Sequence, residues 1–198
     1  MDEELTPRLE AAKKQERLVY FVDAAHFVLG SFIGYLWCIV RIFIPTSSGR
    51  SRYNVLGAID AVTNQLITVC NEAYINACSV CELLNKIKKT VGDNIPITLV
   101  LDNARYQRCA LVAELAIQLK IELLFLPSYS PNLNLIERLW KWVKKDCLNC
   151  KYYECFDKFK DAINQSLLKT SQTDRKKEMD SLLTLNFQLF DSTSYNRC

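Results

Sequence analysis

Three carboxylates stand at places where they could act together on a phosphodiester. Asp23 ends the apolar run that starts at Arg17, Asp102 follows the apolar run Ile97–Leu101, and Glu137 lies early in a later helical pattern. Carboxylates that share a crevice repel one another and need a cation between them. Oxygen ligands suit magnesium or manganese, and two such ions can clamp the attacking and leaving oxygens of a phosphodiester. The chemistry would be nucleotidyl transfer or hydrolysis without a covalent enzyme intermediate.

Each of these acids also has a simpler interpretation. An aspartate after a strand is commonly a turn or cap residue. Glu137 could complete a capping box that Asn134 begins, or pair with Lys141 four residues later. His26, three residues after Asp23, is more typical of a packing or positioning group than of a metal ligand. The joint occurrence of the three acids favours the metal site.

Basic residues accompany the acids. Helical spacing places Glu137, Lys141, Lys144 and Lys145 together on one face, and a basic, turn-rich loop occupies residues 47–52. These side chains could simply be solvated, but next to three acids they could carry a phosphate backbone to the metal ions. The candidate DNA-binding residues are Arg50, Arg52, Arg138, Lys141, Lys144 and Lys145.

The elements that would position the acids form an α/β pattern. Residues 97–126 predict a strand, a helix that includes Leu111, and a parallel strand, with a right-handed crossover. Ligands gather at the carboxyl ends of such strands. The first strand ends on Asp23, and a hairpin is expected over Tyr53–Cys70. Helices are expected over 80–91, 136–147 and 156–167. An edge strand or hairpin is expected over 31–44. The pattern predicts a ribonuclease-H-like fold, a mixed five-stranded sheet flanked by helices.

Composition fits one domain with extensions. The chain has 198 residues, of which 49% are hydrophobic and 24% charged, with a net charge of +3 that permits nucleic-acid binding without demanding it. We expect a polar linker over residues 1–16, a catalytic domain over 17–169, and a helical extension and tail over 170–198. The apolar stretch Phe27–Ile44 contains Arg41 and two glycines, which favours strand over a membrane span.

The nine cysteines indicate reduced thiols. Residues 1–16 are polar and lack the apolar core of a signal sequence, so a cytoplasmic location is expected. The pairs Cys78/Cys81 and Cys147/Cys150 have Cys-x-x-Cys spacing but fall in helical patterns far apart, so buried or incidental thiols are favoured over a zinc site.

The segments DNARYQR and YSPNLNLIERLWKWVKK resemble the catalytic domain of bacterial insertion-sequence transposases related to the mariner elements, within the Asp-Asp-Glu superfamily. FVDAAHF is similar to that family's first-aspartate segment, and 34 residues separate Asp102 from Glu137, as in many members. The similarity spans residues 18–168.

The resemblance implies a ribonuclease-H-like fold and cut-and-paste DNA transposition. Asp23, Asp102 and Glu137 would bind two Mg²⁺ ions, for which Mn²⁺ may substitute. Asn103 would shape the metal pocket, and Ser130, Pro131 and Asn134 would set the turn that aims Glu137. The implied partners are terminal inverted repeats, target DNA and a second copy on paired ends, in the cytoplasm at the bacterial nucleoid.

Three departures qualify the resemblance. Leu135 stands where relatives often have proline, and Gln107 stands where many carry histidine. Residues 1–16 cannot hold the helix-turn-helix modules usual in the family, so we expect a separately translated catalytic half or a truncated chain. Another nuclease or integrase of the same fold, and a non-catalytic DNA-binding or oligomerisation remnant, remain the alternative functions.

Overall fold

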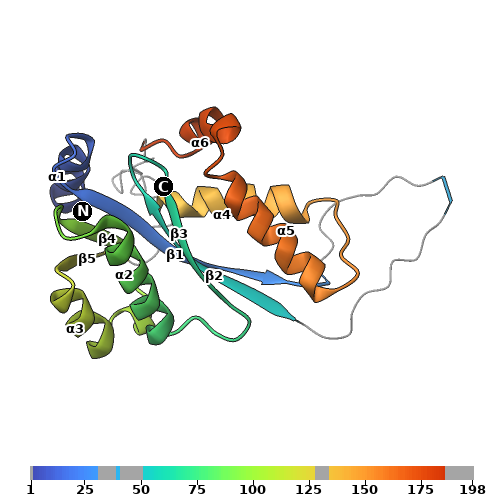
Figure 1. Ribbon diagram of the computed structural model, residues 1–198, viewed down its shortest axis with the longest axis horizontal. Coiled ribbons are helices and arrows are strands. Elements are labelled where there is room, and N and C mark those ends of the chain that lie inside the picture. The colour runs from blue at the N-terminus through green and yellow to red at the C-terminus, as the bar shows by residue number, and fades with distance from the viewer. Residues whose placement is uncertain (1, 31–38, 41–50, 128–133, 186–198) are drawn as a thin grey trace, which may run out of the picture.

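A mixed sheet of five strands, in the order β3-β2-β1-β4-β5, runs through the molecule with helices on both faces (Figure 1). The computed structural model describes residues 2–30, 39–40, 51–127 and 134–185. β1 pairs antiparallel with β2 and parallel with β4; β3 and β5 extend the sheet on either side. The predicted fold class is confirmed. The strands are β1 (Leu18–Val28), β2 (Arg52–Asp60), β3 (Leu66–Asn71), β4 (Ile97–Leu101) and β5 (Ile121–Phe125).

The central strands differ in length, and the sheet therefore forks. β1 pairs with β4 only as far as Val22, opposite Leu101, but pairs with β2 as far as Val28, opposite Arg52. Beyond Val22 the two long strands continue as a ribbon that leaves the parallel part of the sheet (Figure 1). The acids of interest follow directly after the fork.

The predicted hairpin joins β2 to β3 without the usual Asn-Gly turn. The Asp60 carboxylate accepts hydrogen bonds from the backbone N–H of Val62 at 2.9 Å and of Thr63 at 2.7 Å, and from the Thr63 hydroxyl at 2.9 Å. Asn64 supplies the left-handed residue, with φ at 59°. An aspartate that bonds to its own turn thus replaces the preferred dipeptide.

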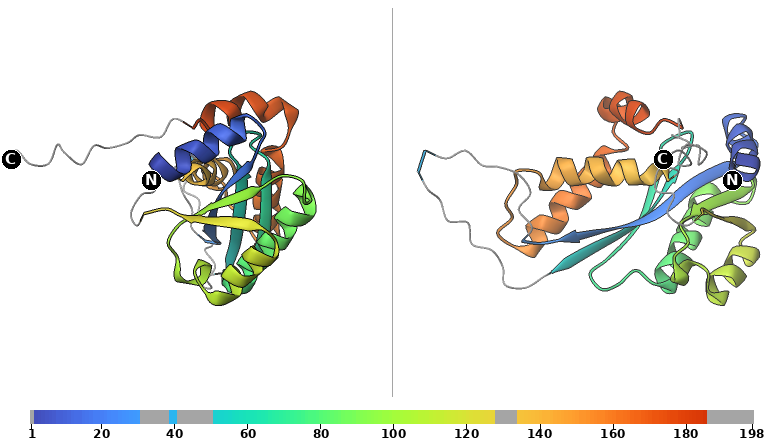
Figure 2. Two further views of the ribbon diagram at one scale, coloured as in Figure 1. Left: turned by 90° about the vertical axis from the view of Figure 1, so that its left-hand side faces the viewer. Right: turned by 180° about the vertical axis from the view of Figure 1, so that it is seen from behind.

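Helices cover the two faces of the sheet unequally (Figure 2). α2 (Ala77–Val91) and α3 (Ala110–Gln118) pack on the face that includes Val22 and Leu101. The opposite face, with Phe21 and Val100, packs against the larger set. That set comprises α1 (Asp2–Lys13), α4 (Leu135–Leu148), α5 (Phe156–Lys169) and α6 (Lys176–Leu182).

The segment expected to be a polar linker, residues 1–16, is helical and docked on the domain where the structure describes it, rather than solvated. Residues 2–13 form α1, whose Leu5, Leu9 and Ala12 are buried in the cluster under α4. Arg8 of α1 forms an ion pair with Glu122 of β5 at 2.5 Å. The few apolar residues of this segment predicted that it would be solvated. In the structure, Leu5, Leu9, Ala12 and the Arg8–Glu122 ion pair hold the short helix against the sheet.

The remaining predictions for the chain are mostly confirmed. α2 ends at Gly92, whose φ is 80°, as expected from the Gly-Asp-Asn sequence. The predicted helix between β4 and β5 is confirmed as α3, with Val112 and Ala116 buried, but Leu111 is 52% exposed. No described helix is long and apolar enough to cross a membrane. The edge strand or hairpin expected over 31–44 lies outside the described residues except for residues 39–40, which form a bend, and Arg50, Ser130, Pro131 and the tail after 185 also lie outside them.

Candidate active site

Asp23 and Asp102 lie side by side just beyond the last β1–β4 pair, Asp23 within β1, which was expected to end there, and Asp102 directly after β4. Val22 and Leu101 form the last pair of the parallel β1–β4 ladder, and each aspartate is the next residue of its strand. Side chains alternate along a strand, so Asp23 shares a face with Phe21, and Asp102 with Val100. Both of those neighbours belong to the cluster under α4. The two carboxylates therefore start from adjacent strands, roughly 5 Å apart, on the α4 face.

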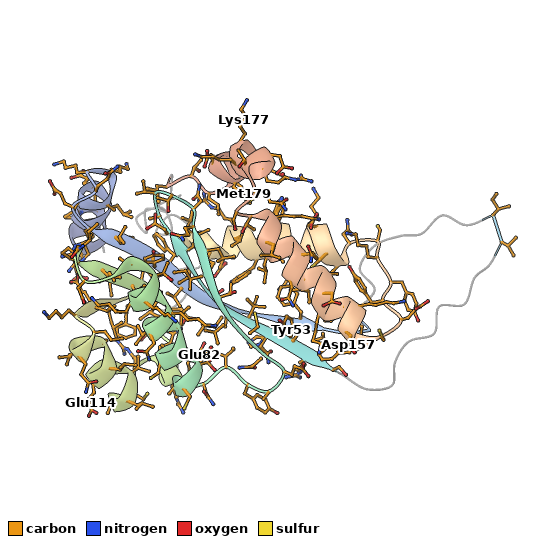
Figure 3. All side chains as sticks on the ribbon, viewed as in Figure 1. Tyr53, Glu82, Glu114, Asp157, Lys177 and Met179 are labelled. Atoms are coloured by element: carbon orange, nitrogen blue, oxygen red, sulfur yellow. The ribbon has the colours of Figure 1, made fainter. Side chains whose placement is uncertain are left out.

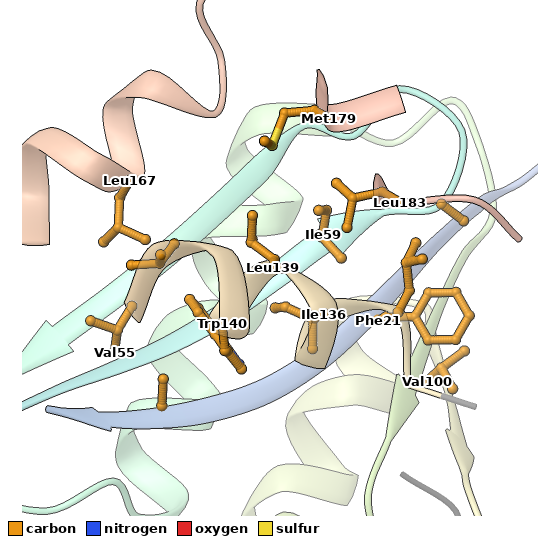
Figure 4. Close-up of a cluster of buried hydrophobic side chains, with 14 of the residues drawn as sticks. Phe21, Val55, Ile59, Val100, Ile136, Leu139, Trp140, Leu167, Met179 and Leu183 are labelled. Atoms are coloured by element: carbon orange, nitrogen blue, oxygen red, sulfur yellow. The ribbon is translucent and has the colours of Figure 1, made fainter. Parts of the chain in front are cut away.

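Glu137 comes to the same place from α4. The helix is held on the sheet by Ile136, Leu139, Trp140 and Val143, all buried (Figure 4). This stripe leaves Glu137, in the first turn, at the border of the buried face and half-exposed. The stripe thereby places Glu137 near Asp23 of β1 and near Asp102 at the end of β4.

The charges of the three acids affect one another. Burial first, and then the charges of Asp102 and Glu137, raise the pKa of Asp23 to about 7, against the lowering effects of the Ala24 backbone N–H and the Trp140 side chain. Burial also raises the pKa of Glu137, where Lys141 lowers it and Asp102 raises it. Such mutual effects act over short distances, so the three predicted residues share one acidic site.

Unpaired polar atoms mark the site as one built for a further group. One carboxylate oxygen of Asp102 (Oδ1) and the Asn134 Oδ1 are buried without a hydrogen-bond partner among the described residues. Buried polar atoms are ordinarily satisfied, and an exception calls for a missing ion or water. Carboxylate and amide oxygens are the ligands that magnesium prefers, so the donor set fits that ion.

The present side-chain positions do not themselves enclose an ion. Within the part of the chain that the structure describes, no three His, Cys, Asp or Glu side chains form a group that could hold a metal. The acids are near enough to perturb one another, and closing around an ion would take rotation of their side chains. The described cysteines form no disulfide with one another; Cys147 is buried and Cys150 is exposed.

Asn134 connects two of the elements that carry the acids. It precedes α4 but makes no side-chain cap there, so the capping box considered for Glu137 is wrong. Its Nδ2 instead donates to the backbone carbonyl of Val22 at 3.3 Å, one residue before Asp23. Asn134 is 4% exposed. Its role at the turn before Glu137 was expected from the resemblance, but the bond to β1 was not.

Of three further predicted residues, one lies beside the acids and two lie away from them. His26 is exposed on the face of β1 opposite to Asp23, where its Nδ1 lies 2.7 Å from Asn54 Oδ1. Arg52 is exposed at the far end of the ribbon, opposite Val28. Asn103 directly follows Asp102 and is exposed. Thus Asn103 stays beside the acids, whereas His26 and Arg52 do not.

The predicted basic face of α4 divides in two. Lys141, Lys144 and Lys145 are exposed, and Lys141 is close enough to lower the pKa of Glu137. Arg138 instead donates to the Thr184 backbone carbonyl at 2.7 Å and to its hydroxyl at 3.2 Å. Arg138 therefore holds the segment after α6, and the lysines form the basic surface.

Sequence reasoning missed a close approach of backbone to helix at the site. Gly57 of β2 lies opposite Asp23, and a Cβ placed there would be 2.7 Å from Trp140 Cη2 and 3.0 Å from Ile136 Cδ1. Only a glycine lets the indole ring reach the strand next to Asp23. The signal in the sequence was a glycine inside a strand pattern, which often marks such an approach.

Comparison with known proteins places the chain in a family. Residues 18–160 match the DDE superfamily endonuclease family. This is most of the chain, and the chain therefore belongs to that family. No curated protein matches the chain.

Solved structures share the fold at low sequence identity. The strand transfer complex of Mos1 aligns with a TM-score of 0.58 and 13% identity, over 96% of this chain and 60% of that one. The simian T-cell lymphotropic virus intasome, in complex with PP2A regulatory subunit B56 gamma, gives 0.55 and 13%, over 78% and 48%. The HTLV-2 integrase catalytic core with magnesium gives 0.50 and 14%, over 80% and 88%. This chain spans about half of the first of these two viral chains, and the shared fold is that of transposase and integrase catalytic domains.

Proposed function

We propose that the chain is the catalytic domain of a DNA transposase, which hydrolyses phosphodiesters and transfers strands with the help of divalent metal ions. The observation that carries the proposal is the pairing of Val22 with Leu101, which brings Asp23 and Asp102 together under Glu137. Membership of the DDE endonuclease family and the fold shared with Mos1 and integrase structures support it.

The residues have distinct tasks in this proposal. Asp23 and Asp102 offer oxygen ligands from adjacent strand ends, and Glu137 offers a third from α4. Bound Mg²⁺ or Mn²⁺, in two positions, would activate water or a 3′ hydroxyl and stabilise the leaving oxygen. Lys141, Lys144 and Lys145 hold the phosphate backbone beside the acids. Asn134 keeps the start of α4 against β1, and Asn103 shapes the pocket next to Asp102.

The finer parts of the proposal come from the resemblance. The chain would act on the terminal inverted repeats of a bacterial insertion sequence, as a homodimer on paired ends, and join them to target DNA in the cytoplasm. The Mos1 paired-end complex, with a TM-score of 0.57 at 14% identity over 94% of this chain, supports such an arrangement. A second candidate is an integrase or nuclease of the same fold, favoured by the likeness to the HTLV-2 core.

Nicking of a supercoiled plasmid with Mg²⁺ or Mn²⁺ tests the proposal. The wild-type chain should nick, and Glu137→Gln should not, although the substitution preserves shape. Glu114→Gln is the matched control, because Glu114 is exposed on α3, on the other face of the sheet (Figure 3). Equal nicking by wild type and Glu137→Gln would overturn the assignment of the site. A strand-joining assay with element-end DNA then separates a transposase or integrase from a simple nuclease.

A further inference from the structure

Two exposed arginines follow Asp102 in the segment that leaves β4. The short 3-10 helix η1 (Arg105–Gln107) begins three residues after Asp102, and Arg108 comes directly after it. Both Arg105 and Arg108 are exposed. Since β4 ends at Leu101, this segment starts at the edge of the sheet where the acids lie.

Packing places this segment on the side of the acids away from α4. Tyr106, between the arginines, packs against the cluster under α2 and α3. The charges of Asp102 and Asp23, after burial, contribute to raising the pKa of Tyr106 to about 12, which is in keeping with a short distance to both acids. On the other face of the sheet, where α4 packs, Lys141 is close enough to Glu137 to lower its pKa.

Arg108 is held without an ion pair. Its Cζ lies 4.8 Å from the centre of the Phe125 ring, and Phe125 pairs in register with Leu101. Stacking on an aromatic ring restrains a guanidinium but leaves its N–H groups available for an anion, and the fork of donors matches a phosphate.

The charge of both arginines is uncompensated. Among the described residues, Arg8, Arg17 and Arg175 form ion pairs with glutamates, whereas Arg105 and Arg108 form none. Two arginines next to three acids, but not paired with them, remain able to bind a phosphate that approaches the acids. Their sequence positions, three and six residues after Asp102, keep them within one short segment of the site.

We propose that Arg105 and Arg108 form a second phosphate-binding rim, so that the DNA backbone crosses the acids between these arginines and the α4 lysines. The inference rests on the proposed function and deepens it, because it names a contact surface that the sequence did not suggest. The contacts are to phosphate and carry no base specificity.

Binding of a fluorescent duplex of arbitrary sequence, without divalent metal and over a salt series, tests the rim. The double variant Arg105→Ala/Arg108→Ala should bind at least about tenfold more weakly near 0.1 M salt, with a slope of log K against log salt that is shallower by about two. Lys13→Ala/Lys14→Ala is the matched control: it removes the same charge from two exposed residues at the end of α1, before β1 begins. Arg108→Lys should recover part of the slope but not the full affinity, because lysine cannot stack and fork in the same way.

The possible outcomes distinguish failure of the phosphate-binding rim from failure of the proposed function. A wild-type slope in the arginine variant would overturn the rim while plasmid nicking still stood as evidence for the enzyme. An equal loss in the Lys13/Lys14 control would also overturn it, because overall charge would then account for the effect. A wild-type chain that binds no duplex at all would overturn both the rim and the proposed function.

Discussion

Asp23 and Gly57 lie opposite each other in the antiparallel β1–β2 ladder, and the space that Gly57 leaves is filled by the Trp140 ring. A Cβ at position 57 would be 2.7 Å from Trp140 Cη2 and 2.8 Å from Cζ2. Real atoms do not approach so closely, and the contact is with a rigid buried ring. The fit of α4 on β2, next to the first acid, therefore depends on one missing methyl group.

Gly57→Ala should destabilise the fold by about 1–3 kcal/mol, the usual cost of overpacking a core. It should also lower nicking activity, because the displaced α4 carries Glu137. Trp140→Leu removes the two ring atoms in question, so the pair of substitutions in one chain should cost less than the sum of the two single effects. Urea denaturation of the four proteins measures the coupling. Strict additivity would show that the ring and the glycine are not in contact.

Asp102→Asn should stabilise the metal-free protein at neutral pH. The Asp23 pKa is raised above its ordinary value of 3.8 to about 7, so folding binds a proton and its contribution to stability falls as pH rises from about 4 to about 7. Removing the Asp102 charge lowers the Asp23 pKa and reduces that loss. A gain on the order of 1 kcal/mol at pH 8, and little at pH 4, is expected in the presence of a chelator.

Added magnesium should make the wild type more stable than Asp102→Asn, the reverse of the order expected without metal. An ion that binds only the folded protein stabilises it by mass action, so the wild type should gain melting temperature as magnesium is added and Asp102→Asn should gain little. The metal titration uses thermal denaturation, independently of any DNA substrate. A gain of the same size in both proteins would show that the stabilising ions bind elsewhere.

Asn134→Ala should cost about 1–2 kcal/mol by removing the buried hydrogen bond to the Val22 carbonyl, which spans 3.3 Å. Asn134→Asp should cost more, although it keeps the shape, because it replaces the donor with a charged acceptor beside three other acids. Denaturation in urea ranks the variants. If Asp proved milder than Ala, the contact to Val22 would not be the reason for an asparagine here.

The ion pair between Glu122 and Arg8 of α1 should stabilise the fold, and this contribution should be lost at acidic pH. Its pKa is lowered from 4.5 to about 2, first by the hydrogen bond from Arg8, with smaller contributions from Thr98 and Arg17. A lowered carboxyl pKa stabilises the fold above the ordinary value, and this contribution is lost as pH falls towards 2. The difference in melting temperature between wild type and Glu122→Gln should therefore shrink between pH 5 and 2. Glu114→Gln, at an exposed glutamate that forms no ion pair among the described residues, should show no such trend.

The sequence predicted the acidic site because its evidence is local. Apolar runs end on Asp23 and Asp102, and the apolar stripe of α4 fixes where Glu137 lies on that helix. Parallel pairing of the two strands then follows from general rules of α/β sheets. These three steps need only periodicity and topology.

Contacts between distant residues could not be predicted in this way. Arg8 meets Glu122 across 114 residues, and Arg138 meets Thr184 across 46. The first contact docks α1 on the sheet, and the second ties Arg138 to the segment after α6. The side of β1 that His26 occupies follows from strand alternation, but the sequence alone did not show that β1 would continue past Asp23 to Val28.

The fork at Val22 and Leu101 has a consequence for how such enzymes can diversify. The parallel strands stop there, while β1 and β2 run on together to Val28 and Arg52. The acids are thus fixed by pairing on the near side, and the distal ribbon is held separately, by pairing of β1 with β2 and of β2 with β3 and by contacts such as Tyr53 with Asn164. Insertions or deletions at the ribbon's far end can accumulate without shifting the catalytic register. The same scaffold can thereby acquire new appendages while its chemistry stays in place.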